Sequence, residues 1–222
     1  MVSQIKSKIS VVKPRDSVQV TFPSGLTLEG EVGTTIEEFL IAAEPHLGGY
    51  DSPIMGGVLD GKLRELSYPV KRDSPLRPVL LSSSDGGRIY RRSLVMLLAT
   101  AINELWPDLK VNVSYSVPEG GFYCTLPQRQ PFTSAELERL EAHMREIVEQ
   151  NDPITKRIVP LDEAVALFKS RGEDDKVRLL EQRTRNDLTL YTLRGRSDYF
   201  YGYMLPSTGY LTVFRLIRAG DG

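Results

Sequence analysis

The chain has 222 residues, of which 41% are hydrophobic and 26% are charged. These proportions are typical of a globular protein with enough apolar material for one large or two small cores. Lys and Arg total 28 and Asp and Glu total 29. This balance excludes a global attraction to nucleic acid, so any RNA contact would need a local basic patch. The single cysteine, Cys124, excludes an internal disulfide and is typical of a reducing compartment.

No segment has the length and apolarity of a membrane anchor. The longest apolar run, Leu94 to Ala99, has six residues, whereas a spanning helix needs about 20. The N-terminus has no apolar stretch of the signal-peptide kind. We therefore expect a cytoplasmic protein with no membrane partner.

The first 82 residues contain a polar tail and a small α+β pattern. Residues 1–17 carry more basic than acidic side chains and predict a solvated tail, with an RNA-binding arm as the alternative. Apolar residues then alternate from Val18 to Phe22 and again from Leu26, on either side of a Pro-Ser-Gly turn, which predicts a β-hairpin.

A helix and further strands follow the hairpin. Thr34 or Thr35 can cap a helix, with a glutamate three residues later, and Pro45 is expected to end it. Short strands are expected at 54–59 and 78–81. The order strand, strand, helix, strands within about 65 residues is that of a β-grasp fold.

Three short segments carry a resemblance across residues 18–82. They are Ser24-Gly25, Gly33-Thr34-Thr35 and Leu59-Asp60-Gly61-Lys62-Leu63. In order and spacing they resemble the TGS domain, a ubiquitin-like β-grasp module at the N-terminus of threonyl-tRNA synthetases. The serine- and glycine-rich residues 83–88 then predict a linker. No Gly-Lys-Ser/Thr follows them, which excludes a P-loop at this point.

Residues 89–218 predict a second α+β domain. Apolar residues at helical spacing indicate a helix at 89–106, and Thr133 with Glu136 forms a capping box at the start of another. Alternation and turn residues predict the remaining elements. These are strands at 110–117, 122–126, 153–160, 188–193 and 211–217, and helices at 161–171 and 176–181.

A second resemblance rests on five segments. They are Leu105-Trp106-Pro107-Asp108, Gly121-Phe122-Tyr123, Pro131-Phe132-Thr133, Leu161 to Phe168 and Pro206-Ser207-Thr208-Gly209. In this order they resemble the editing domain of threonyl-tRNA synthetases. Together the two resemblances cover residues 18–218. The same pair of domains occurs in bacterial uridine kinase-like proteins of the phosphoribulokinase/uridine kinase family, where a P-loop kinase domain follows.

The residues that carry the editing chemistry are replaced. The resemblance implies two histidines one helical turn apart and a Cys-x-x-x-His, which would hydrolyse mischarged tRNA. This chain has Arg92 and Met96 at the first pair of positions, and Phe200 and Met204 at the second. Arginine stays protonated, and phenylalanine has no lone pair, so neither serves as a base or metal ligand. We therefore expect no catalytic residue, no metal and no cofactor in this chain.

The replaced positions suggest a degenerate cleft that binds a ligand. Arg92 near a helix start would favour an anion. If residues 199–204 form a strand, Phe200 and Met204 face the cleft with Met96, while Tyr199, Tyr201 and Tyr203 point away. That geometry predicts an apolar floor and weak or no nucleotide binding. The alternative is an aromatic and arginine cluster that stacks a base and holds a phosphate.

The absent chemistry guides the functional hypothesis, because a kinase does not need an editing site. The expected protein is the non-catalytic regulatory or ligand-binding N-terminal region of a uridine or nucleoside kinase. ATP and Mg would then belong only to a downstream kinase domain, which would be its partner. The alternative is a free-standing tRNA- or RNA-binding module related to threonyl-tRNA synthetase. An active aminoacyl-tRNA editing hydrolase is the third and most distant possibility.

Overall fold

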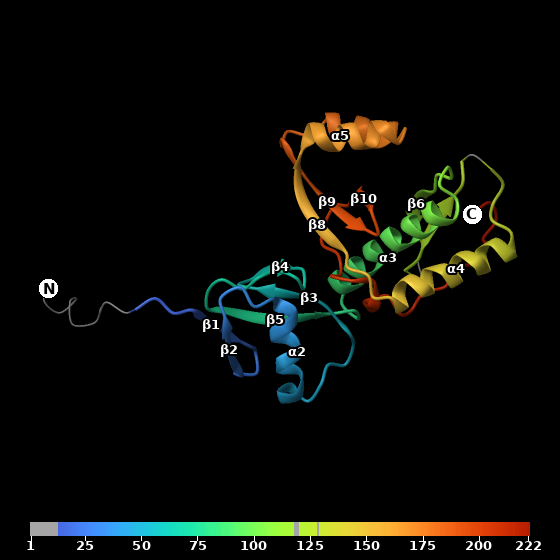
Figure 1. Cartoon of the computed structure of the whole chain (residues 1–222). Coiled ribbons are helices and arrows are strands. Elements are labelled where there is room, and N and C mark those ends of the chain that lie inside the picture. Colours follow the sequence, from blue (N-terminus) through green and yellow to red (C-terminus); the bar gives the residue numbers. More distant parts are fainter. Residues whose placement is uncertain (1–12, 118–119, 128) are drawn as a thin grey trace, which may run out of the picture.

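The computed structural model describes residues 13–117, 120–127 and 129–222. It is a mixed α+β structure, as the sequence predicts, with one sheet near the N-terminus and further helices and strands beyond it (Figure 1). Most of the expected tail, up to residue 12, lies outside the described residues, as do Pro118 and Glu119 between two of the expected strands.

The N-terminal sheet has five strands in the order β2-β1-β5-β3-β4. The predicted hairpin is confirmed, with Val18 opposite Gly30 and Val20 opposite Leu28. Strand β5 pairs parallel to β1 in the middle of the sheet, and the other neighbours are antiparallel. The strands are β1 (Ser17–Thr21), β2 (Thr27–Glu31), β3 (Ile54–Leu59), β4 (Lys62–Arg64) and β5 (Ser74–Leu80).

Helix α2 (Ile36–Leu47) begins as predicted but ends later. The side chain of Thr35 accepts a hydrogen bond from the Glu38 backbone N–H, and Glu38 accepts from that of Thr35 at 2.8 Å, which completes the capping box. Pro45 lies inside the helix rather than ending it. Its fixed φ is helical, and only one hydrogen bond is lost in the last turn. The helix stops at Gly48, whose φ of 77° is left-handed.

The glycine-rich residues expected as a linker form the first turn of a long helix, α3 (Ser84–Leu105). The Ser83 side chain caps this helix by accepting from the Gly86 backbone N–H at 3.1 Å. A Cβ at Gly86 would overlap the backbone oxygen of Leu80 at the end of β5. Glycine is therefore required here for a close approach of helix and strand, not for a flexible joint. The division into two domains stays a prediction.

The described residues beyond α3 form two small sheets and three further α-helices. Strands β10-β9-β8 make one antiparallel sheet and β6-β7 the other. The capping box of Thr133 and Glu136 is confirmed at the start of α4. The elements are β6 (Asn112–Ser116), β7 (Phe122–Thr125), α4 (Ser134–Glu149), β8 (Thr155–Pro160), α5 (Leu161–Ser170), α6 (Asp174–Glu181), β9 (Asp187–Leu193), β10 (Arg196–Tyr199) and the 3-10 turn η1 (Thr208–Tyr210).

The strand expected at 211–217 is wrong. This segment has no strand partner and instead runs along α4. The Leu216 backbone N–H donates to Glu141 at 2.8 Å, and Arg145 donates to the carbonyl of Phe214 at 3.0 Å. Side chains of α4 therefore satisfy backbone groups that a sheet would otherwise pair.

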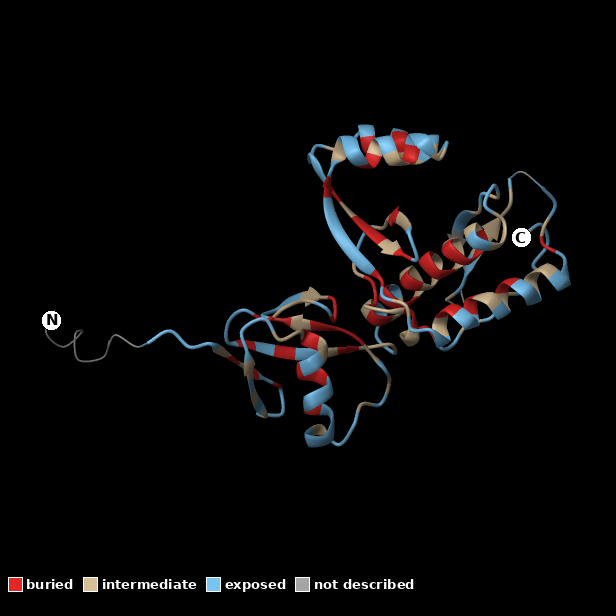
Figure 2. Cartoon of the chain, in the orientation of Figure 1, coloured by how far each residue is buried: buried red, intermediate tan, exposed pale blue. Residues whose placement is uncertain are grey.

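A single large hydrophobic core joins the N-terminal sheet to the helices beyond it. Buried residues of α2, such as Leu40, belong to the same cluster as Ile89 and Met96 of α3 and Leu140 of α4. Figure 2 shows these buried positions in red on α2 and along α3. A second, smaller core lies between α5, α6 and the sheet of β8 and β9. Among the described residues, no helix is long and apolar enough to cross a membrane.

Two glycine substitutions test whether the start of α3 is a packed junction. Gly86→Ala should lower the free energy of unfolding by about 1–3 kcal/mol, because its methyl group overlaps the end of β5. Gly87→Ala is the matched control, since the nearest atom is the mobile end of Arg91. It should leave stability unchanged or raise it by up to about 1 kcal/mol through helix propensity. Urea unfolding measures both, and equal effects would indicate a flexible linker.

Candidate functional site

The four residues predicted to form the degenerate cleft divide into two groups. Met96 and Met204 are buried in the large core, at 0% and 1% exposure. Arg92 and Phe200 line a pocket of about 670 Å³, which we call the arginine–tyrosine pocket. The full lining is Leu63, Asp85, Arg88, Ile89, Arg92, Lys156, Arg183, Thr189, Tyr191, Tyr199, Phe200, Tyr201, Gly202 and Tyr203.

The prediction that the cleft has an apolar floor, with the tyrosines pointing away from it, is wrong. Strand β10 ends at Tyr199, and the chain then turns through Gly202, which has a φ of 116°. Because the segment is not a strand, strict alternation of side chains does not hold. Tyr201 and Tyr203 line the same pocket as Phe200. Tyr201 is 87% exposed.

Arg92 is held in the pocket by the irregular segment. It lies about two turns inside α3, too far from Ser84 for the unpaired N–H groups of the helix start to reach its ligand. Its Nη1 donates to the carbonyl of Tyr203 at 2.5 Å. A Cβ at Gly202 would overlap the guanidinium, so glycine makes room for it. Burial lowers the pKa of Arg92, and the charge of Arg88 acts in the same direction.

The pocket has more cationic than anionic charge. Its acidic lining residue, Asp85, pairs with Arg88 at 3.4 Å. Arg183 donates to the Tyr199 hydroxyl at 2.8 Å and lies over the Tyr199 ring. Within the described part of the chain, neither Arg92 nor Arg183 has a carboxylate within ion-pair distance. Two guanidinium groups are thus left to attract an anion.

Tyr191 forms the buried wall of the pocket. Its hydroxyl lies 3.1 Å from a carboxylate oxygen of Glu65 and 3.2 Å from the carbonyl of Gly202. Burial raises the pKa of Tyr191 to about 12, although the charge of Arg92 opposes the shift. The hydroxyl therefore stays protonated at neutral pH and acts as a hydrogen-bond donor.

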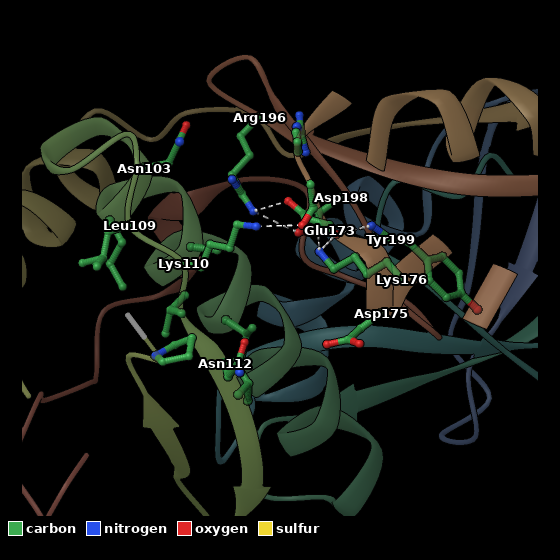
Figure 3. A pocket seen from close by; sticks show the side chains of 18 of the residues that line it. Asn103, Leu109, Lys110, Asn112, Glu173, Asp175, Lys176, Arg196, Asp198 and Tyr199 are labelled. Atoms are coloured by element: carbon green, nitrogen blue, oxygen red, sulfur yellow. Dashed lines mark hydrogen bonds and ion pairs between the residues drawn. The ribbon is translucent and has the colours of Figure 1, made fainter. Parts of the chain in front are cut away.

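A second cavity has a volume of about 1040 Å³, and we call it the charged pocket. Figure 3 shows side chains that line it. Tyr199 and Phe200 line both pockets and lie between them. Its charges neutralise one another: Lys176 pairs with Asp198 at 2.6 Å and with Glu173 at 2.7 Å, and Arg196 lies 3.4 Å from Asp198. The charged pocket therefore lacks the excess cationic charge of its neighbour.

The two histidines and the single cysteine lie outside both pockets. His143 sits between Glu104 at 2.7 Å and Glu146 at 3.1 Å on the α3–α4 surface, and His46 lies in the last turn of α2. Burial raises the pKa of the Cys124 thiol, which disfavours the nucleophilic thiolate. Among the described residues, no group of three or more His, Cys, Asp or Glu side chains could hold a metal.

Sequence reasoning missed several lining residues. Arg183 follows α6, Tyr191 is on β9 and Lys156 is on β8, so only the tertiary fold brings them to Arg92. The sequence predicts a cluster of tyrosines near Phe200, but a regular strand would place them on the side away from the pocket. The positive φ of Gly202 ends the alternation of side chains, and the sequence pattern does not reveal it.

Most of this chain is similar in sequence to one part of the threonine–tRNA ligases. No family model matches it. Threonine–tRNA ligases of Burkholderia lata and Burkholderia orbicola are each 36% identical over 202 residues, and that of Burkholderia vietnamiensis is 35% identical. The matches cover 90% of this chain but 31% of each relative, so the chain spans about a third of their length. These relatives favour the synthetase-related alternative over a kinase regulatory region.

Truncation of Met96 tests its assignment to the core. Met96→Ala should lower the free energy of unfolding by about 2–5 kcal/mol, because the side chain is fully buried. Leu179→Ala is the control, since Leu179 lies on α6 and is 57% exposed. It should change stability by less than about 0.5 kcal/mol. A small effect at Met96 in urea unfolding would mean that its side chain lines an open cleft.

Proposed function

We propose that this chain is a non-hydrolytic RNA-binding module related to threonyl-tRNA synthetase, whose arginine–tyrosine pocket receives a nucleotide at an RNA end. The observation that carries the proposal is the pair Arg92 and Arg183, two guanidinium groups without a carboxylate partner in the described residues, beside several tyrosine rings. The relatives are named for joining threonine to tRNA. This supports RNA as the source of the nucleotide.

The side chains of the pocket match the two parts of a nucleotide. Guanidinium groups bind phosphate through paired N–H donors, and here the incomplete solvation of Arg92 strengthens its need for an anion. Exposed aromatic rings stack on unpaired bases, and Tyr201 offers such a ring. The volume of about 670 Å³ is within the usual range for small-ligand pockets.

The residues present also oppose hydrolysis. An esterase needs a base or a metal-bound water near the ester. Met96 and Met204 are buried, and Phe200 and Arg92 supply neither a base nor a ligand. The module would therefore hold an RNA end without cleaving an aminoacyl ester from it.

The N-terminal sheet is, in this proposal, a β-grasp domain of the TGS kind. Its strand order β2-β1-β5-β3-β4, with α2 between the two hairpins, supports this assignment. The relation to uridine kinase-like proteins gains no support from the relatives found. A free nucleotide such as UMP is accordingly a competitor to include in binding measurements, not the primary ligand.

RNA binding should depend on the two arginines of the pocket. We expect Arg92→Ala and Arg183→Ala each to weaken binding of a fluorescent single-stranded RNA by about tenfold or more, because each removes a charge-assisted hydrogen bond. Each should also reduce the slope of log affinity against log salt by about 0.7, the value for one phosphate contact on a single strand. Fluorescence anisotropy at several KCl concentrations measures both quantities.

Arg72→Ala is the control for this measurement. Arg72 pairs with Asp60 at the exposed end of the N-terminal sheet and is not among the lining residues. Its removal should change neither affinity nor slope by more than experimental error. Equal losses in all three variants would mean that RNA binds the surface through general charge and not in the pocket.

Seryl-tRNA(Thr) should not be deacylated faster by the chain than by buffer alone. The expectation follows from the absence of a base or metal ligand at Arg92, Met96, Phe200 and Met204. Release of radiolabelled serine with time gives the rate. A clear acceleration at catalytic concentrations of protein would contradict the non-hydrolytic part of the proposal.

A further inference from the structure

The N-terminal sheet contributes directly to the arginine–tyrosine pocket. Leu63 of β4 is part of its lining. The next residue, Arg64, donates to the Tyr203 hydroxyl at 3.0 Å. The third, Glu65, contacts two other lining residues, Lys156 and Tyr191. Arg64 and Glu65 therefore hold pocket residues that lie more than 90 positions later in the chain.

Glu65 is a buried carboxylate with partners across this junction. The residue is 2% exposed. It forms an ion pair with Lys156, whose side chain is 41% exposed, and it accepts a hydrogen bond from Tyr191. A buried carboxylate is costly unless it is paired and hydrogen-bonded. The ion pair with Glu65 therefore keeps the ammonium group of Lys156 in place, although Lys156 also lines the pocket.

We propose that Glu65 is a positioning residue that sets the charge of the arginine–tyrosine pocket. By engaging Lys156, it withholds that cation from the ligand and leaves Arg92 and Arg183 to meet a phosphate. Two guanidinium groups can together engage the oxygens of a phosphodiester, the phosphate found within an RNA strand. This inference rests on the proposed function and specifies its ligand class.

Glu65→Gln isolates the effect of the charge. The amide keeps an oxygen that can accept from Tyr191, but it loses the ion pair with Lys156. The lysine head group, on its flexible four-carbon chain, is then free to turn toward a phosphate. Lys156→Met removes the cation while keeping an unbranched side chain of similar length.

A stability cycle tests the pairing without any ligand. Lys156→Met leaves the Glu65 carboxylate buried without its cation, so we expect a clear fall in the urea midpoint. Adding Glu65→Gln removes the stranded charge and should restore part of that loss. If the losses of stability in the two single variants instead add up in the double variant, the two residues are not coupled and the proposal is wrong.

The salt dependence of RNA binding tests the effect on the ligand. Lys156→Met alone should leave the slope of log affinity against log salt unchanged, because Glu65 already holds the lysine. Glu65→Gln should steepen the slope by about 0.7, which is one additional phosphate contact, and tighten binding several-fold at low salt. The double variant should return to the slope of the unaltered chain.

Three results would overturn the ligand part of the proposal. A shallower slope in Lys156→Met would show that the lysine contacts RNA despite Glu65. An unchanged slope in Glu65→Gln would show that its charge does not govern the pocket. If the unaltered chain binds no RNA, the proposed function fails and this part fails with it. The stability cycle would still decide whether Glu65 and Lys156 are engaged.

Discussion

The packing of helix α3 against both halves of the chain is the constraint on which the rest depends. At its start, Gly86 allows the helix to approach the end of β5. Further along, the Ser93 hydroxyl donates to the carbonyl of Ile89 and accepts from the backbone N–H of Leu205. The helix also packs on α4 and β9. Arg88 and Arg92 are therefore presented from a rigid element, and the segment after β10 is fixed against them.

The residue types at the replaced positions have separate consequences. Methionine at 96 and 204 extends the hydrophobic core where a polar side chain would need a hydrogen-bond partner. Arg92 instead brings a charge into a half-buried place, where its side chain donates a hydrogen bond to the carbonyl of Tyr203. The two methionines thus contribute to the hydrophobic core, while Arg92 carries the charge that the proposed anion would meet.

Local features of this fold were predictable because their causes lie within a few residues. The Thr35–Glu38 and Thr133–Glu136 boxes need only a four-residue pattern, and the first hairpin needs only alternation and a turn. The glycine-rich segment is predicted to be a linker but belongs to a helix. Glycine is needed at Gly86 because the backbone of Leu80 lies against it, and this tertiary contact cannot be seen in the local sequence.

The pocket was only partly predictable for the same reason. Arg92 and Phe200 followed from the family resemblance, and both line it. The partnership of Glu65 with Lys156 joins residues 91 positions apart and leaves no periodic trace in the sequence. The direction of the tyrosines depended on the left-handed turn at Gly202, which a strand pattern cannot reveal.

Photo-crosslinking tests most directly whether an RNA end binds in the arginine–tyrosine pocket. A single-stranded RNA ending in 4-thiouridine would be irradiated with the unaltered chain, and the crosslinked peptide identified by mass spectrometry. Binding in the arginine–tyrosine pocket predicts crosslinks within residues 199–203, where Tyr201 is the most exposed ring. They should be lost on competition with unlabelled RNA. Crosslinks confined to the N-terminal sheet or to α4 would contradict a ligand site in this pocket.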